Sequence, residues 1–317
     1  MTDIAILGSG AFGTALAIAL SRDGSEVTLW GRDPGDIAEM GATRTTGRAL
    51  PGIALPDSLR VTPAFPDARI MLVAIPAQQV RGFLEQHRDA LTGRVLISCA
   101  KGVEKGTGLG TVDVLDNVIP DATTGCLTGP SFAADIARGL PTALVLAMRT
   151  GAEEVQPKLN RPSLRVYRSD DVIGAQLGGA LKNVIALASG IAIGAGLGDS
   201  ARASVIARGF AEMVRYARGQ GAKAETLQGL AGLGDLVLTC SSEKSRNFSA
   251  GLALGRGERI DPAITVEGLA TASQLADQST REGFEMPLAQ TVALIAEGRL
   301  KVSDAIDALL ARPAGKE

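Results

Sequence analysis

Histidine is nearly absent from this chain, which has a single copy, His87, among its 317 residues. The surrounding residues 85–89 (EQHRD) are polar, so we expect this imidazole to be solvated on the exposed face of a surface helix. Histidine is the most frequent general acid or base in enzymes. Any proton transfer by this chain is therefore expected to depend on lysine or carboxylate side chains.

Cysteine is also scarce, since Cys99, Cys126 and Cys240 are widely spaced, odd in number and outside any CxxC pair. This pattern is typical of a reducing compartment and predicts no metal site. The net charge of −2 disfavours nucleic acid as a partner. We therefore expect a cytoplasmic protein that binds neither zinc nor nucleic acid.

Long hydrophobic runs are missing as well. The uncharged stretch Asn183 to Gly198 is broken by glycine and is shorter than the roughly 18–20 residues that span a bilayer. Residues 1–3 (MTD) lead directly into a strand-like run, so neither a signal peptide nor membrane insertion is expected. Aromatic residues make up only 3% against 45% hydrophobic residues, which predicts an aliphatic core in a chain long enough for about two domains.

The N-terminal segment carries a dinucleotide-binding pattern. An apolar run, Ile4–Leu7, precedes residues 8–13 (GSGAFG), and a helix-like run, Ala15–Leu20, follows. In this context the three glycines allow a tight turn and a close approach of the backbone to a pyrophosphate at the helix N-terminus. Gly8, Gly10 and Gly13 are therefore predicted cofactor contacts in a Rossmann-type domain.

The second predicted strand, Val27–Trp30, bears on the choice of cofactor. A site selective for NAD places Asp or Glu at the end of this strand, whereas Gly31 and Arg32 follow here and Asp33 lies one step beyond. Arg32 could pair with the 2′-phosphate of NADP, and its alternative is an ordinary surface arginine. We expect NADP or NAD, with NADP accepted.

The first 170 residues alternate between strand-like and helix-like segments, which predicts a parallel α/β domain. Helix is expected over 79–91 and further strands at 70–75, 94–98, 126–128, 143–147 and 164–167. Lys101 and the turn Gly129–Ala133 each follow a strand, where ligands bind in such sheets. Asp171 is a candidate N-cap for the first helix of a domain that is helical throughout. We place the domains at 1–170 and 171–317.

That first helix carries the most distinctive lysine. Apolar residues recur at three- and four-residue steps beside Lys182, and Gly178 and Gly179 lie one turn before it. Each glycine in a helix interior lowers the stability of the helix by roughly 1 kcal/mol relative to alanine, so a packing or ligand contact should offset this loss. Either they allow close helix packing beneath a lysine that reaches to solvent, or they form a floor of small residues that admits a ligand to Lys182. We favour the second interpretation.

Two later segments carry polar side chains suited to a ligand. Asp235 lies at a predicted helix start, and Thr239 four residues later shares its face. Arg246 stands between Ser245 and Asn247, and its guanidinium suits a phosphate because it can bind two oxygens at once. A solvated loop arginine is the alternative for Arg246.

Together these segments resemble the bacterial NAD(P)-dependent glycerol-3-phosphate dehydrogenases. The matching pieces occur in the order of that family: Gly8–Gly13, Lys101–Glu104, Gly129–Ala133, Gly179–Asn183, Leu230–Cys240, Ser245–Asn247 and Val266–Gly268. The resemblance implies a Rossmann domain followed by an all-α domain of the 6-phosphogluconate-dehydrogenase-like type. It also implies interconversion of dihydroxyacetone phosphate and sn-glycerol 3-phosphate, which supplies phospholipid synthesis.

The resemblance also implies roles for individual residues. Lys182 is similar to the catalytic proton acceptor of the family. The implied substrate contacts are Lys101, Gly129, Ser131, Lys182, Asp235, Ser245, Arg246 and Asn247, and the implied cofactor contacts beyond the glycines are Ala11, Phe12, Trp30, Arg32, Lys101, Ala133, Arg246 and Glu267. The chain departs from the family pattern at Ala11, where a side-chain hydrogen bond is lost and only the backbone can serve. It also departs at Ser200 and Phe248, two positions that are not central but bear on fine contacts with the substrate.

For Lys182 to act as a base near neutral pH, its pKa must fall from about 10.4 to about 7–8. Burial, Lys101 and Arg246 should lower this pKa, and Asp235 should raise it. The expected ligand is a small phosphorylated three-carbon molecule, and a homodimer is left open. The alternatives are a β-hydroxyacid or 6-phosphogluconate-type dehydrogenase, or a regulator that senses NAD(P) without catalysis.

Overall fold

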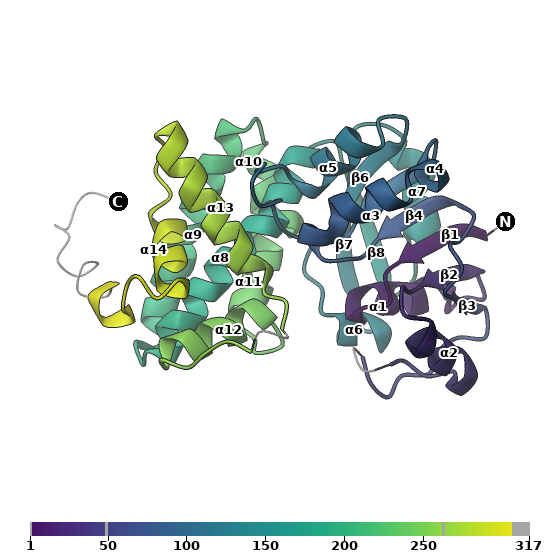
Figure 1. Cartoon of the computed structure of the whole chain (residues 1–317), viewed down its shortest axis with the longest axis horizontal. Coiled ribbons are helices and arrows are strands. Elements are labelled where there is room, and N and C mark those ends of the chain that lie inside the picture. The colour runs from purple at the N-terminus through teal and green to yellow at the C-terminus, as the bar shows by residue number, and fades with distance from the viewer. Residues whose placement is uncertain (1, 48–49, 262–263, 306–317) are drawn as a thin grey trace.

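The chain forms an α/β lobe followed by a helical lobe, seen at the right and left of Figure 1. The computed structural model describes residues 2–47, 50–261 and 264–305. A single eight-stranded sheet lies in the α/β lobe in the order β3-β2-β1-β4-β5-β6-β7-β8, and only the β6–β7 pair is antiparallel. The strands are β1 Thr2–Leu7, β2 Val27–Trp30, β3 Leu59–Thr62, β4 Ala68–Val73, β5 Val95–Ser98, β6 Thr123–Thr128, β7 Thr142–Met148 and β8 Leu164–Ser169.

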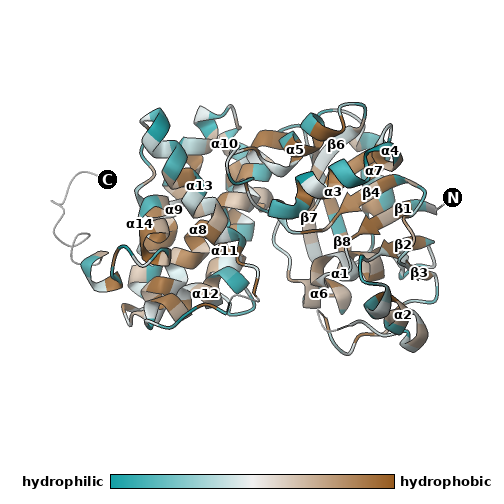
Figure 2. Ribbon diagram, viewed as in Figure 1, coloured by the Kyte–Doolittle hydropathy of each residue, from teal (hydrophilic) through white to brown (hydrophobic). Residues whose placement is uncertain are grey.

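Helices cover both faces of this sheet because alternate strand residues point to opposite sides. Ile4 and Ile6 of β1 join the core under α1, α2, α6 and α7, whereas Ala5 and Leu7 join the core under α3, α4 and α5. Strands β1, β2 and β4 are accordingly mostly hydrophobic (Figure 2), whereas the edge strands β3 and β8 carry exposed arginines. The helices of this lobe are α1 Ala11–Ser21, α2 Pro34–Thr43, the 3₁₀ turn η1 Ala77–Gln79, α3 Val80–Gln86, α4 Arg88–Leu91, α5 Thr111–Val118, α6 Ala133–Ala137 and α7 Ala152–Leu159.

The predicted Rossmann-type α/β architecture is confirmed, with two local differences. Strand β3 was not expected, and the helix expected over 79–91 is broken at His87, whose φ of −115° leaves the helical region. The His87 ring is half-buried and stacks on Phe65 with 4.4 Å between ring centroids, beside Trp30 and Phe83. The expectation of a fully solvated histidine was therefore wrong, and burial lowers the pKa of this imidazole.

The helical lobe is built around α8, Val172–Gly194, which Asp171 caps by accepting a 2.8 Å hydrogen bond from the Gly174 N–H, as predicted. This helix is long and apolar enough to cross a membrane, but 89% of its most apolar window is buried inside the protein, so it is a core helix. Around it lie α9 Gly198–Gly219, α10 Ala224–Gln228, the π-helical turn η2 Leu230–Gly234, α11 Asp235–Cys240, α12 Arg246–Gly255, α13 Glu267–Glu282 and α14 Pro287–Ala296.

Glycines bring α12 very close to α8. A Cβ on Gly190 of α8 would lie 2.1 Å from the Phe248 carbonyl oxygen, and one on Gly251 of α12 would lie 2.2 Å from the Leu187 carbonyl oxygen. Glycine at both positions therefore lets the two backbones touch. This contact fixes the start of α12, which carries Arg246 and Asn247, relative to the helix that carries Lys182.

Candidate active site

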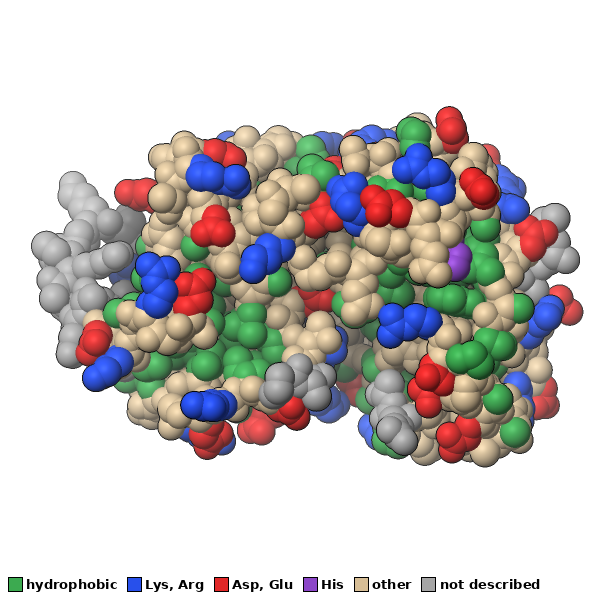
Figure 3. Space-filling view, viewed as in Figure 1, with side chains coloured by type: hydrophobic (Ala, Val, Ile, Leu, Met, Phe, Trp, Pro, Cys, Tyr) green, Lys and Arg blue, Asp and Glu red, His purple; other side chains and the backbone are tan. Residues whose placement is uncertain are grey.

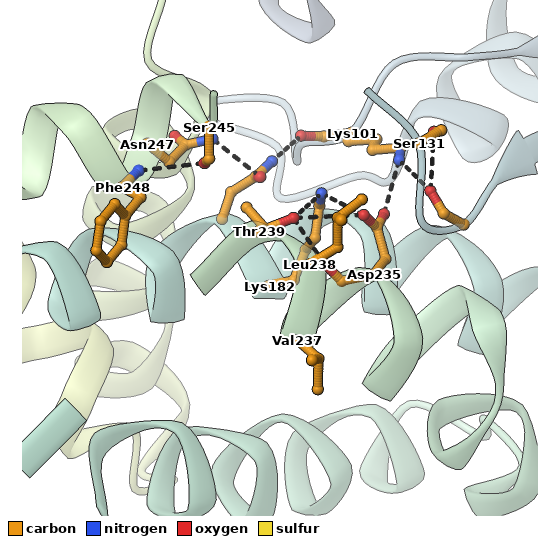
Figure 4. Close-up of polar contacts among 12 residues, drawn as sticks. Lys101, Ser131, Lys182, Asp235, Val237, Leu238, Thr239, Ser245, Asn247 and Phe248 are labelled. Atoms are coloured by element: carbon orange, nitrogen blue, oxygen red, sulfur yellow. Dashed lines mark hydrogen bonds and ion pairs between the residues drawn. The ribbon is translucent and has the colours of Figure 1, made fainter. Parts of the chain in front are cut away.

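Asp235 is the centre of a buried polar cluster between the two lobes (Figure 4). It is only 1% exposed and is the first residue of α11, as expected. Its Oδ1 accepts a 2.6 Å hydrogen bond from Lys182 Nζ of α8, and its Oδ2 accepts a 2.7 Å bond from Lys101 Nζ of the α/β lobe. One carboxylate thus holds two lysines from different lobes.

Lys182 is fixed by a third group, the Thr239 hydroxyl. Thr239 Oγ1 accepts from Lys182 Nζ at 2.6 Å and donates to the Asp235 backbone carbonyl oxygen at 2.6 Å. Lys182 itself is 6% exposed. The sequence pattern placed Thr239 on the face of Asp235 but did not identify it as a site residue, because its contact with Lys182 bridges 57 positions.

Burial lowers the pKa of Lys182 to about 8, helped by the charge of Lys101 and opposed by Asp235. This value meets the requirement set for a base near neutral pH. Burial also disfavours the Asp235 carboxylate, but Lys101 and Lys182 outweigh it and hold the pKa of Asp235 below its usual value. At neutral pH the cluster therefore carries one negative and up to two positive charges, an arrangement that attracts an anionic ligand.

The adjacent glycines before Lys182 serve helix packing. A Cβ on Gly178 would lie 2.5 Å from the Ala231 carbonyl oxygen in η2, and one on Gly179 would lie 2.9 Å from Thr128 Oγ1 and 3.5 Å from Lys101 Cγ. The favoured interpretation of an open floor for a ligand was wrong, because protein atoms already occupy that space. The alternative was wrong about the lysine, which is buried and hydrogen-bonded.

Lys101 connects the cluster to the turn after β6. Its Nζ also donates to the Gly129 carbonyl oxygen at 3.0 Å, and the same oxygen accepts the Ser131 hydroxyl at 3.0 Å. Gly129 has a φ of +128°, a conformation that side chains rarely permit. The turn therefore holds Lys101 and Ser131 together beside Asp235.

Asn247 belongs to a chain of amides that crosses the site. Asn183 Nδ2 donates to the Lys101 carbonyl oxygen, Asn247 Nδ2 donates to Asn183 Oδ1, and the Gly268 N–H donates to Asn247 Oδ1, each at 2.9 Å. Each side-chain amide has thus used its oxygen and one N–H, so what remains is a second N–H donor. The sequence pattern did not identify Asn183 as part of this chain.

Ser245 and Arg246 begin α12 beside this chain. Ser245 is the N-cap, and its Oγ accepts a 3.2 Å hydrogen bond from the Phe248 N–H. Arg246 is exposed, and its charge acts on Glu267. Phe248 is 4% exposed and packs in the core, so this departure from the family pattern does not face the site, and Ser200 is exposed on α9.

The glycine turn after β1 has the shape that a dinucleotide needs. Gly8 has a φ of +123° and no room for a Cβ, which would lie 2.5 Å from the Ala74 carbonyl oxygen, and a Cβ on Gly13 would lie 2.1 Å from the Gly8 carbonyl oxygen. A Cβ on Gly10 would meet nothing within 4 Å. Internal packing therefore explains two glycines, and the open space at Gly10 fits the approach of a pyrophosphate. Ala11 and Phe12 follow as the first residues of α1.

The remaining predicted cofactor contacts lie in different environments. Arg32 is exposed two residues after the end of β2, and Asp33 is the N-cap of α2, accepting from the Asp36 N–H at 2.9 Å. Trp30 is 7% exposed, and its Nε1 donates to the Pro63 carbonyl oxygen. Ala133 begins α6.

Glu267 crosses between the lobes, since its Oε1 accepts from the Ala77 N–H at 3.0 Å. Burial raises the pKa of this carboxyl, and the Ala77 N–H and Arg246 oppose the rise. Figure 3 shows that the surface is hollowed between the two lobes, below the middle of the view. In the described part of the chain no three His, Cys, Asp or Glu side chains are grouped so that they could hold a metal ion.

Comparisons with known proteins agree on one family. Residues 3–153 match the family model "NAD-dependent glycerol-3-phosphate dehydrogenase N-terminus", and residues 171–307 match the model for the C-terminus of the same family. A protein of Ruegeria sp. (strain TM1040) named glycerol-3-phosphate dehydrogenase [NAD(P)+] is 54% identical over 99% of both chains. A protein of Paracoccus denitrificans with the same name is 53% identical over 99% of both.

A solved structure shows the same fold. The crystal structure of glycerol-3-phosphate dehydrogenase from Coxiella burnetii is 35% identical, superposes with a TM-score of 0.91, and covers 98% of this chain and 99% of its own.

Proposed function

This chain belongs to the NAD-dependent glycerol-3-phosphate dehydrogenase family, and from that premise we propose that Lys182 exchanges the proton on the C2 oxygen of the substrate. The chain is an NAD(P)-dependent oxidoreductase that acts on a CH–OH group, interconverting dihydroxyacetone phosphate and sn-glycerol 3-phosphate. The observation that carries the role of Lys182 is its buried ammonium, held by Asp235 and Thr239 at 2.6 Å each.

The proton and the hydride have separate sources. The turn Gly8–Gly13 would hold NAD(P)H, which would supply the hydride for C2 of the ketone. In the same reduction the Lys182 ammonium gives a proton to the C2 oxygen and becomes neutral. In the oxidation the neutral amine takes that proton back, which the lowered pKa of about 8 favours. Asp235 and Thr239 orient the amine, and Lys101 adds a positive charge beside the developing alkoxide.

The phosphate of the substrate is proposed to bind at the start of α12. Arg246 brings a guanidinium, Asn247 keeps a second amide N–H, and the Ser245 hydroxyl keeps its hydrogen. All three are donors, which suits an anion with three acceptor oxygens. Lys101, Gly129 and Ser131 are the proposed contacts on the opposite side of the substrate.

A comparison of two ketones tests the proposed phosphate contact. Arg246→Ala should lower kcat/KM for dihydroxyacetone phosphate at least tenfold, because a hydrogen bond to a charged group contributes about 1.5–3 kcal/mol. Turnover of unphosphorylated dihydroxyacetone should change little. Arg246→Lys should lose less activity than Arg246→Ala but should not match the parent, because an ammonium cannot bind two oxygens at once as a guanidinium does. An unchanged ratio of the two kcat/KM values would contradict the assignment.

Substrate and cofactor panels separate this function from its alternatives. Oxidation of NADPH and NADH should depend on dihydroxyacetone phosphate and not on β-hydroxyacids or 6-phosphogluconate. Cofactor binding without turnover of any substrate would favour the regulator.

We also propose that the enzyme is cytoplasmic and supplies phospholipid synthesis, so its depletion should lower the concentration of glycerol 3-phosphate in the cell. The homodimer that the sequence leaves open can be tested by light scattering.

A further inference from the structure

We propose that Lys244 is a positioning residue that fastens the proposed phosphate-binding turn to the opposite lobe. Lys244 directly precedes Ser245, Arg246 and Asn247 in the connection between α11 and α12. Its Nζ lies 3.1 Å from Asp135 Oδ1 of α6 and 5.5 Å from the centroid of the Phe132 ring. This inference rests on the proposed function, because the phosphate site defines what is being positioned.

The contact joins the two turns that carry proposed substrate ligands. Phe132 directly follows Ser131 in the turn after β6, and Lys244 directly precedes Ser245 at the start of α12. One ammonium therefore ties both turns together across the space between the lobes. An ion pair and a cation–π contact act on the same group, so its position is better defined than by either alone.

Lys244 makes the side-chain contact that links the connection between α11 and α12 to the α/β lobe. The other contacts of residues 241–246 are local: Ser245 N donates to the Ser242 carbonyl oxygen, and the Glu243 carbonyl oxygen accepts from Ser249 Oγ. In the described part of the chain no other side chain of residues 241–246 bonds to the α/β lobe. Loss of the Lys244 contact should therefore let the turn, and Arg246 with it, move away from Ser131.

A second explanation must be separated from positioning. Lys244 is a cation near a proposed anion site, so Lys244→Ala could weaken substrate binding simply by removing a favourable charge. Asp135→Asn separates the two effects because they have opposite signs. It breaks the ion pair with almost no change of shape, and it also removes a negative charge that repels the substrate.

The kinetic test uses both variants with dihydroxyacetone phosphate. Lys244→Ala and Asp135→Asn should each raise KM roughly two- to fivefold, the effect of a partly exposed ion pair, with kcat within about twofold of the parent. The double variant should be no worse than the worse single variant. Lys244→Arg should keep the parent KM. As a matched control, Lys223→Ala removes an exposed ion pair with Asp170 and should leave KM unchanged.

A lower or unchanged KM in Asp135→Asn would overturn the proposal, as would additive effects in the double variant. A readout independent of activity is trypsin cleavage after Arg246 in the protein without ligand, which Asp135→Asn should accelerate severalfold over the parent. Unchanged cleavage would overturn positioning even if the parent turned over no substrate. A parent that cleaves as expected but has no activity would instead refute the proposed function.

Discussion

At the scale of single residues, replacement of Lys182 tests the proposed proton transfer, because hydrogen bonds hold its ammonium in one position. Its three partners in the cluster are Asp235, Thr239 and, through Asp235, Lys101. Lys182→Ala should lower kcat by roughly 10²–10⁴-fold, the usual effect of a lost general acid or base. Binding of NADPH, measured by fluorescence titration, should be nearly unchanged.

The control for Lys182→Ala is Lys182→Met, which keeps most of the buried volume. Both variants should lose activity equally, and only the alanine variant should also lose packing. Turnover within a few-fold of the parent in either variant would show that another group moves the proton.

Arg32 is the residue on which the proposed acceptance of NADP depends. It is exposed after β2, and its neighbour Asp33 uses Oδ1 to cap the N-terminus of α2. Arg32→Ala should weaken NADPH binding about tenfold or more and NADH binding much less, because only NADPH carries the extra phosphate. Titration of both cofactors checks this, and equal losses would exclude Arg32 as the phosphate contact.

At the scale of elements, the joint between α8 and η2 can be tested through one glycine. A Cβ on Gly178 would lie 2.5 Å from a backbone oxygen of η2, and Asp235 follows η2 directly. Overpacking costs about 1–3 kcal/mol, and the better helix propensity of alanine recovers at most about 1 kcal/mol. Gly178→Ala should therefore lower the free energy of unfolding by roughly 1–2 kcal/mol and also reduce kcat.

The matched control for this joint is Gly41→Ala in α2, where a Cβ would meet nothing within 4 Å. That variant should be neutral or more stable by up to about 1 kcal/mol in urea unfolding, with normal kcat. Equal free energies of unfolding for Gly178→Ala and Gly41→Ala would show that η2 moves to accommodate the added Cβ without loss of stability.

The elements also show where sequence reasoning succeeds. The glycine turn, the Asp171 cap and the start of α11 were predictable because each depends on residues within a few positions of one another. Strand β3 was missed because its four residues pair with β2 only through tertiary folding. His87 breaks its helix because its ring packs against distant aromatic side chains.

The same distinction holds within the site. The residue types of Lys182, Asp235 and Arg246 led to the chemistry proposed for them, but the partners of Asn183 lie 82 and 64 positions away. No local pattern encodes such a chain of amides. Likewise the glycines before Lys182 indicated that some group approaches the helix closely, but the sequence did not distinguish a ligand from another part of the protein. The position of η2 in the structure shows that it is the protein.

At the scale of the whole molecule, the pKa of Lys182 depends on both lobes, since Lys101 comes from one and Asp235 from the other. Burial lowers this pKa to about 8. In the proposed mechanism, oxidation of glycerol 3-phosphate uses the neutral amine of Lys182, so its kcat/KM should rise with pH and level off above about pH 8. Reduction requires the ammonium, so its kcat/KM should be constant below that pH and fall above it.

Substitutions of Lys101 and Asp235 test whether Lys182 is the group that titrates in these pH profiles. The positive charge of Lys101 lowers the pKa of Lys182, so Lys101→Ala should move the midpoint of both profiles to higher pH, whatever its effect on the maximal rate. Asp235 acts in the opposite direction, and Asp235→Asn should move the midpoint to lower pH. Lys223→Ala, which removes an exposed lysine paired with Asp170, should leave the midpoint where it is. The two site substitutions act from different lobes and should shift the midpoint of the pH profile in opposite directions. A midpoint that stays the same in both Lys101→Ala and Asp235→Asn would therefore show that a group outside this cluster transfers the proton.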